Sequence, residues 1–226
     1  MRLVIVSATR YSEQEFWQFC PLGQSLSRLS FDSRIRSLLA YSNQAGLSQV
    51  YNHRLSLMQE DETALFIHDD VWIEDFALCD HLQAGLDVYA VVGIAGSKRR
   101  SGGQPAWCFH DRSWTIDDET NLSGRVGFGA YPFGSIQHYG PVPCECELLD
   151  GVLMGVRKST LDKAGIRFDQ RFDFHFYDLD LCRQLRNAGL RIGTWPICIT
   201  HQSGGSYGGE HWEAGYKSYL EKWGND

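Results

Sequence analysis

Long hydrophobic runs are missing from this sequence of 226 residues. The longest uninterrupted apolar stretch, residues 88–96, has nine residues, two of them glycine, whereas a helix that crosses a bilayer needs about 20. The first eight residues carry one positive charge and too few apolar side chains for the core of a signal peptide. The sequence therefore predicts neither a transmembrane segment nor a secretion signal.

Regular cysteine spacing and excess positive charge are also missing. The seven cysteines are odd in number and share no repeated spacing, which fits a reducing cytoplasm better than a disulfide framework. Lys and Arg total 21 against 28 Asp and Glu, a formal net charge of −7, and this argues against nucleic-acid binding. No Walker loop, GxGxxG, GxSxG or HExxH motif is present.

What the chain does contain is an alternation of strand and helix patterns over the first 95 residues. Short apolar runs predict strands at 3–6, 35–41, 64–67 and 88–95. Helices are expected after the capping-box spacing of Ser12 and Glu15, and at 47–58 and 74–83. Such alternation indicates an α/β fold with a mostly parallel, mixed sheet flanked by helices.

The remainder of the chain is less regular. Residues 97–147 are rich in Gly, Pro, Trp and Tyr and have no helical period, so we expect loops with short antiparallel strands. After this stretch, the patterns predict strands at 152–157 and 191–200, a helix at 178–188 closed by Gly189, a glycine-rich loop at 203–209 and a helix at 210–223. We find no repeat or linker and expect a single domain.

The segment His68-Asp69-Asp70 follows the predicted buried strand at 64–67. Ligands of open α/β sheets bind at the carboxyl ends of the strands. Two adjacent carboxylates there repel each other unless a cation is present, and Mg²⁺ takes one or two carboxylates together with phosphate oxygens. The segment indicates a divalent-metal site, and a turn that caps the following helix is the alternative.

Two acidic residues, Asp178 and Asp180, open the predicted helix at 178–188. Asp178 shares a helix face with Cys182, whereas Asp180 lies on the polar face with Arg183. We therefore expect Asp178 to point inward and Asp180 to point toward solvent. An inward carboxylate can have a raised pKa and accept a proton, and the alternative is a carboxylate stabilised by the helix dipole.

His201 stands at the end of a predicted strand, directly before the glycine-rich loop. An imidazole in such a place can ligate a metal ion, and the loop can close over a bound substrate. The alternative is a hydrogen-bonded surface histidine. These three segments are the candidates for chemistry in the chain.

In their order and spacing, these segments resemble the family-2-like glycosyltransferases of the GT-A fold, and in particular the StrF-type branch known from streptomycin biosynthesis. The resemblance covers most of the chain and rests on residues 51–52, 66–71, 93–96, 150–154, 174–181 and His201. It implies one GT-A-like domain over residues 1–226. The nucleotide-binding half would be 1–95, the irregular insertion 97–147, and the acceptor and catalytic half 148–226.

The resemblance also implies roles for individual residues. On the donor side it implies Ser7, Thr9, Asn43, Asn52, His68 and Asp69. For the metal, Mn²⁺ or Mg²⁺, it implies Asp70 and His201; for the acceptor, Asp150, Gly151 and His175; and for the catalytic base, Asp178. Two residues depart from the family pattern: His68 replaces the first acid of the Asp-x-Asp motif, and Tyr177 replaces the acid before the base.

The function implied is metal-assisted, inverting transfer of a hexose from a nucleoside-diphosphate sugar to the hydroxyl of a glycan, a lipid-linked or a small-molecule acceptor. A lipid-linked acceptor would place this cytoplasmic protein at the inner face of the membrane. The alternative is a GT-A-like module that binds a nucleotide sugar or glycan without transferring it. A nucleotidyltransferase fits less well, because the first strand lacks a glycine-rich basic loop for a triphosphate.

Overall fold

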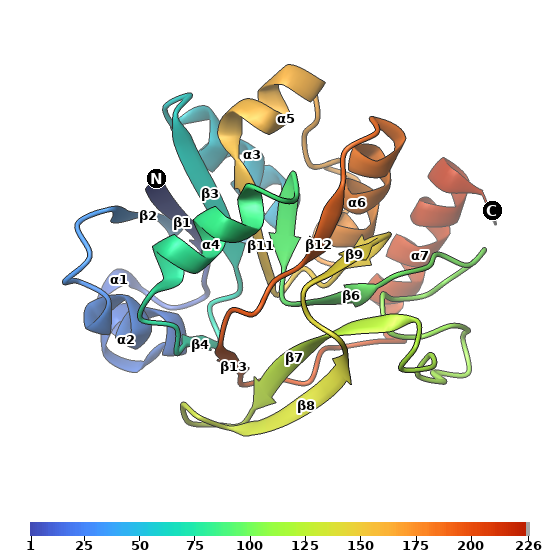
Figure 1. The fold of residues 1–226 in the computed structure, drawn as a ribbon, viewed down its shortest axis with the longest axis horizontal. Coiled ribbons are helices and arrows are strands. Elements are labelled where there is room, and N and C mark those ends of the chain that lie inside the picture. Colours follow the sequence, from blue (N-terminus) through green and yellow to red (C-terminus); the bar gives the residue numbers. More distant parts are fainter. Residues whose placement is uncertain (225–226) are drawn as a thin grey trace.

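A computed structural model describes residues 1–224 and has the expected α/β fold (Figure 1). The helices are α1 (Glu13–Phe19), α2 (Pro21–Arg28), α3 (Leu47–Ser56), α4 (Leu78–Leu86), α5 (Lys158–Ala164), α6 (Tyr177–Asn187) and α7 (Glu210–Trp223). The strands are β1 (Arg2–Ala8), β2 (Ile35–Ala40), β3 (Glu62–Ile67), β4 (Val71–Ile73), β5 (Val91–Gly93), β6 (Ala95–Ser97), β7 (Leu122–Phe128), β8 (Ser135–Gly140), β9 (Cys144–Cys146), β10 (Leu148–Leu149), β11 (Leu153–Arg157), β12 (Ile192–Thr194) and β13 (Ile199–His201).

The larger sheet has seven strands in the order β2-β1-β3-β11-β5-β12-β9. Its pairings make β1, β2, β3, β5 and β12 run in one direction, and β9 and β11 in the other. The sheet is therefore mixed and mostly parallel, as the sequence predicts. Every residue of β3 is buried, as expected for a strand that is covered on both faces.

Helices cover the two faces of this sheet. On one face, Leu82 of α4 lies against the backbone of Gly155 in β11, the residue paired with Leu65 of β3. On the other face, Phe66 packs against Tyr51 of α3, with ring centroids 4.7 Å apart. Neighbouring residues of a strand point to opposite faces, so α3 and α4 lie on opposite sides of the sheet (Figure 1).

The predicted irregular segment, residues 97–147, contains short strands and no helix. Most of its strands belong to a second sheet, in the order β10-β6-β7-β13-β4, with β8 paired to β7. Strands β4 and β13 come from the parts of the chain before and after this segment. The segment is thus tied by backbone hydrogen bonds to both of the regions that carry the candidate motifs.

Two of the predicted strands are each divided between the sheets. Residues 88–95 form β5 in the large sheet and then enter β6 of the second sheet, and residues 191–200 form β12 and β13 in the same way. The prediction of single strands was wrong because residues with apolar side chains, such as Ile94 and Ile197, continue across the point where the chain passes from one sheet to the other. Apolar content alone does not mark such a crossing.

Helices with a clear capping or periodic pattern in the sequence were predicted well. Ser12 and Glu15 form the expected capping box of α1, and α7 has the predicted bounds. The start of the helix predicted at 74–83 is wrong. Residues 71–73 form β4, which pairs with β13, and the helix α4 begins only at Leu78. Helices α2 and α5 were not predicted.

Candidate active site

A cleft of about 590 Å³ opens where β1 and β3 end. Residues from distant parts of the sequence line it, namely Ala8, residues 68–70, 105–109, 150–151, 174–179 and 203–207, and His201. The three segments singled out in the sequence therefore face one cavity. In open α/β sheets, ligands bind at this end of the strands.

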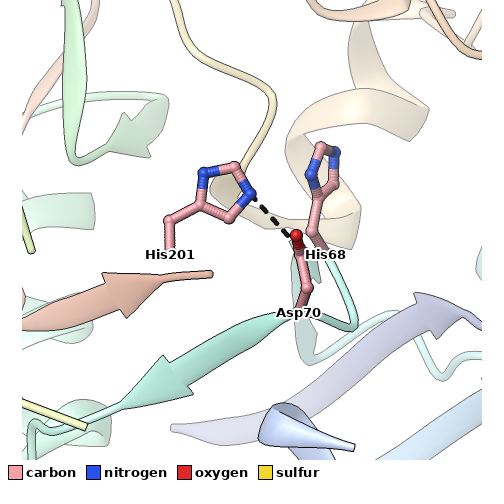
Figure 2. A group of neighbouring side chains, drawn as sticks. All are labelled: His68, Asp70 and His201. Carbon is pink, nitrogen blue, oxygen red and sulfur yellow. Dashed lines mark ion pairs between the residues drawn. The ribbon is translucent and has the colours of Figure 1, made fainter. Parts of the chain in front are cut away.

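Three side chains in the cleft form a candidate metal group: His68, Asp70 and His201 (Figure 2). One ligand atom from each lies within 4.8 Å of the others, and Asp70 Oδ1 is 3.2 Å from His201 Nε2. Imidazole nitrogens and carboxylate oxygens are common ligands of divalent ions. The donor set fits a divalent cation, with one carboxylate and two imidazoles on the protein side.

The strand register brings this group together. His201 ends β13 and pairs with Val71 of β4, and the amide of Gln202 donates to the carbonyl of Asp70 at 2.9 Å. On the opposite side, the amide of His68 donates to the carbonyl of Val152, just before β11. The motif after β3 is thus held between the strand that carries His201 and the segment that carries Gly151.

The pKa values of Asp70 and His68 in the metal group are shifted by different causes. Burial raises the pKa of Asp70, but the hydrogen bond and charge of His201 outweigh it, so this pKa lies well below its usual range. Burial, opposed by the charge of Asp70, lowers the pKa of His68. Asp70 is therefore ionised at neutral pH and His68 neutral, the forms in which both side chains can ligate a metal ion.

Asp178 lies in the same cleft, in the first turn of α6. Its carboxylate accepts hydrogen bonds from the amides of Gly151 at 3.0 Å and Leu179 at 2.9 Å. Burial, together with the negative charge of Asp150, raises the pKa of Asp178 to about 7. A carboxylate with such a pKa can accept a proton near neutral pH, which agrees with the inward orientation predicted for it.

The expected solvent orientation of Asp180 is wrong. Its side chain is fully buried and lies 2.6 Å from Lys222 Nζ, and it accepts a hydrogen bond from Trp223 Nε1 at 2.7 Å. Both partners belong to the last turn of α7, which packs beside α6 (Figure 1). The helical period alone could not reveal this, because the face that looks polar in the sequence is covered by another helix.

Four residues predicted on the donor side do not line the cleft. Asn52 is bonded through both amide atoms to the backbone of Phe168, at 2.7 and 3.0 Å, and Asn43 bonds the backbone of Ala45. Ser7 and Thr9 are buried at the end of β1. Both asparagines therefore use their side chains to hold backbone, Asn43 that of its own turn and Asn52 that of a segment distant in the sequence.

The other predicted residues do line the cleft. They are Asp69, Asp150, Gly151 and His175. Burial raises the pKa of Asp69 and lowers that of His175. Their assignment to donor and acceptor remains a prediction, since the structure brings them to one cavity without dividing it.

An aromatic wall, which the sequence reasoning missed, faces these polar groups. It consists of Trp107, Phe109, Phe128, Tyr139 and Tyr207. Trp107 and Tyr139 meet edge to face with centroids 4.9 Å apart. For the four members of this wall before Tyr207, the signal in the sequence is the aromatic content of residues 97–147, which does not say which rings reach the cleft.

The charged side chains that line the cleft are mostly acidic. Within residues 1–224, no Lys or Arg is among its lining residues, whereas four carboxylates are: Asp69, Asp70, Asp150 and Asp178. A strongly anionic ligand would meet repulsion here unless a bound cation compensated the charge.

Comparison with known proteins identifies the fold. No protein-family model and no curated protein matches the chain. Among solved structures, the chain is similar to GalNAc-T7 with UDP, GalNAc and Mn²⁺, at a TM-score of 0.53 and 8% identity, over 96% of this chain and 47% of that chain. It is also similar to the catalytic domain of Drosophila beta1,4galactosyltransferase 7 in complex with xylobiose, at a TM-score of 0.51 and 9% identity, over 93% and 77% of the two chains.

The chain thus has the fold of GT-A glycosyltransferases and spans about half the length of the GalNAc-T7 structure. At such low identity, the likeness establishes the fold and not the activity. The StrF-type branch remains a prediction from the sequence. None of the helices within residues 1–224 has the length and apolar character needed to cross a membrane.

Proposed function

We propose that this protein is a metal-dependent glycosyltransferase that moves a hexose from a nucleoside-diphosphate sugar to an acceptor hydroxyl. The observation that carries the proposal is the meeting of a His-Asp-His group and Asp178 in one cleft at the strand ends of a GT-A fold. The similar GalNAc-T7 structure, which holds UDP, GalNAc and Mn²⁺, supports this donor class and a divalent ion.

The charge of the cleft supports metal dependence. The leaving group of the reaction is a nucleoside diphosphate, and no Lys or Arg lines the cleft within the described residues 1–224. His68, Asp70 and His201 would hold a divalent ion, Mn²⁺ or Mg²⁺, which would supply positive charge for that leaving group. The protein itself contributes the ligands and a rigid position at the end of β3.

Asp178 is the residue suited to activate the acceptor. Its carboxylate is oriented by the amides of Gly151 and Leu179 and has a pKa of about 7. The acceptor hydroxyl attacks the anomeric carbon on the face opposite the diphosphate, and its proton passes to Asp178. The carbon–oxygen bond to the diphosphate breaks as the new glycosidic bond forms, which inverts the anomeric configuration.

The aromatic wall suits a ring-shaped acceptor. Trp107 and Tyr139 line the same cleft as Asp178. Trp and Tyr have a large apolar ring and one polar group, the indole N–H or the hydroxyl. Their rings can therefore pack on the apolar face of a sugar ring. Among glycan, lipid-linked and small-molecule acceptors, the cleft favours those that present such a ring.

A donor-binding experiment tests the proposal. UDP-, GDP-, dTDP- and CMP-linked sugars are screened by thermal shift, with and without Mn²⁺; a donor at about 100 times its Kd should add about 2.7 kcal/mol of stability. The matching donor should then be turned over with an acceptor panel that contains sugar rings. Asp178→Asn, which keeps an oxygen for the Gly151 amide, should lower kcat by about 10²–10⁴ and leave donor binding intact.

Each outcome of this experiment has a distinct meaning. If none of the donors stabilises the protein, with or without Mn²⁺, the proposal is overturned. If a donor binds but neither transfer nor hydrolysis occurs over a broad acceptor panel, the protein is the nucleotide-sugar-binding module that the sequence left as the alternative.

A further inference from the structure

The two positions at which this sequence departs from the family pattern touch each other. His68 follows β3, and Tyr177 begins α6, more than a hundred residues later. In the structure, His68 Nε2 lies 2.9 Å from the hydroxyl of Tyr177. Because the two residues that depart from the pattern form a hydrogen bond with each other, we expect them to share one role. The position of the hydrogen atom in this bond indicates what that role is.

The direction of this hydrogen bond follows from counting protons. The Tyr177 hydroxyl has one hydrogen, and it is donated to the carbonyl of Gly151 at 2.9 Å. A carbonyl oxygen can only accept. Toward His68 Nε2, the Tyr177 oxygen can therefore only accept, so the hydrogen of the His68 ring is on Nε2. The Tyr51 hydroxyl, which also lies beside this oxygen, leaves that direction unchanged, because the Tyr177 hydrogen is already donated to Gly151.

We infer that Tyr177 is a positioning residue that fixes His68 as the Nε2–H tautomer and so leaves Nδ1 as a third ligand of the metal group. In a neutral imidazole, one nitrogen donates and the other has a lone pair. Figure 2 shows the second ring nitrogen of His68 on the side that faces His201. Partners of this kind, behind a ligating histidine, set its tautomer and its ring orientation.

A His68 ligand also bears on which ion binds. Mg²⁺ prefers oxygen ligands and keeps several waters, whereas imidazole favours first-row transition metals. With His68 and His201 both ligating, nitrogen supplies two of the three protein ligands. The donor set therefore favours Mn²⁺ over Mg²⁺, a choice that the sequence left open.

Gly151 joins the metal group to the proposed base. Its carbonyl accepts from Tyr177, and its amide donates to Asp178 Oδ2. A Cβ at this position would lie 2.3 Å from the Tyr177 hydroxyl oxygen, far inside van der Waals contact, so only glycine permits this approach. A single residue thus orients His68 through Tyr177, by its carbonyl, and Asp178 directly, by its amide.

The tautomer is tested first, on the unmodified protein without metal. Imidazole ¹⁵N chemical shifts, measured by NMR on ¹⁵N-labelled protein, distinguish Nε2–H from Nδ1–H histidine. We expect His68 to be the Nε2–H tautomer, and we expect Tyr177→Phe to lose that preference. An Nδ1–H tautomer in the unmodified protein overturns the inference, and this result needs no variant to fold.

Metal affinity is tested next, by calorimetric titration with Mn²⁺ or Mg²⁺ alone. The unmodified protein should bind Mn²⁺ more tightly than Mg²⁺, and Tyr177→Phe should weaken Mn²⁺ binding by about 10–100-fold, as for other residues that orient a ligand. In a His68→Ala background, Tyr177→Phe should have no further effect, because its action passes through His68. Pulsed EPR of bound Mn²⁺ should detect two coordinating imidazoles, and one in His68→Ala.

Tyr216→Phe is the matched control. The Tyr216 hydroxyl also donates to a glycine carbonyl, that of Gly103, at 2.6 Å, but Tyr216 does not line the cleft. This variant should keep the Mn²⁺ affinity of the unmodified protein. Equal affinities for Tyr177→Phe and the control, or one imidazole in the unmodified protein, would overturn the inference.

The inference rests on the proposed metal site, and the two can fail separately. If the unmodified protein binds neither Mn²⁺ nor Mg²⁺, both the third ligand and the metal dependence of the proposed function are wrong. If Mn²⁺ binds and a donor is turned over, but Tyr177→Phe changes neither the affinity nor the tautomer, only the positioning role is wrong.

Discussion

At the scale of single residues, Asp178 combines burial with chemistry. Desolvation disfavours its charged form, and the charge of Asp150 adds to this effect. The folded protein therefore holds Asp178 protonated to a higher pH than an exposed aspartate, so the free energy of unfolding falls as the pH rises from 3.8, the usual aspartate value, to about 7 and levels off above it. At the pH at which Asp178 can accept a proton, its buried charge therefore lowers the free energy of unfolding.

The pH profile should reflect this balance. Because the base form of Asp178 dominates only above its pKa of about 7, kcat/KM should rise with pH through that value. The ionisable groups facing Asp178 are Asp150, Tyr51, Tyr177, Cys182 and Tyr207. Asp150 is the acid among them, so Asp150→Asn should move the rise to lower pH. The measurement is a rate profile across this range for both proteins.

Asp61→Asn provides the control for removal of an equal charge. Asp61 is exposed and pairs with Arg2 at the opposite end of β3. Its loss should leave the midpoint of the profile unchanged. A midpoint that does not move in Asp150→Asn, or that moves equally in both variants, would contradict the assignment of the rise to Asp178.

At the scale of elements, the contact between α6 and α7 keeps the first turn of α6 in place. The buried carboxylate of Asp180 bonds Lys222 and Trp223 of α7, and Arg183 of α6 lies over the Trp223 ring at 4.5 Å. Asp180 comes two residues after Asp178. The terminal helix therefore helps to set the position of the proposed base without reaching the cleft there.

Removal of the Lys222 charge should weaken this contact strongly. Lys222→Met leaves Asp180 buried without its cation, and breaking a buried pair in this way costs about 3–5 kcal/mol. Urea denaturation should detect this loss in the free energy of unfolding. Lys217→Met, on the same helix, breaks only an exposed pair with Glu221 at 3.9 Å and should change stability by less than about 0.5 kcal/mol.

The elements also show what a sequence pattern can predict. Helix α7 and the capping box of Ser12 depend on signals within one turn or one helical face, and they were predicted. The closing glycine of α6, Gly189, has a φ of +74° and ends the helix as expected. The burial of Asp180 and the split of residues 88–95 between two sheets depend on tertiary contacts, and local patterns do not contain them.

At the scale of the whole molecule, the same distinction applies to the site. His68, Asp70, Asp178 and His201 stand at strand ends or a helix start, and sheet topology brings such positions together. Asn52 has a side chain suited to ligand binding but holds a backbone segment more than a hundred residues away. The aromatic wall and the Tyr177 contact depend on how distant segments pack, which composition does not indicate.

The glycine-rich loop, residues 203–209, links the irregular segment to the metal group. It starts two residues after His201, and Ser203 Oγ lies 3.2 Å from His201 Nε2. Further along the loop, the ring centroid of Tyr207 lies 5.2 Å from that of Phe109 and 5.5 Å from that of Trp114. One side chain therefore holds an otherwise glycine- and serine-rich loop against the wall of the cleft.

Tyr207→Ala should release this loop. Without the ring contacts, amides of residues 203–209 should exchange hydrogen faster, since glycine-rich chain gains much conformational entropy when freed. With water admitted to the cleft, donor hydrolysis should rise relative to transfer. Tyr131→Ala removes an exposed ring between β7 and β8, 79% accessible, and should change neither exchange in the loop nor the product ratio. Equal exchange of the loop in the two variants would mean that Tyr207 does not anchor it and that the loop reaches its place over the cleft by its backbone alone.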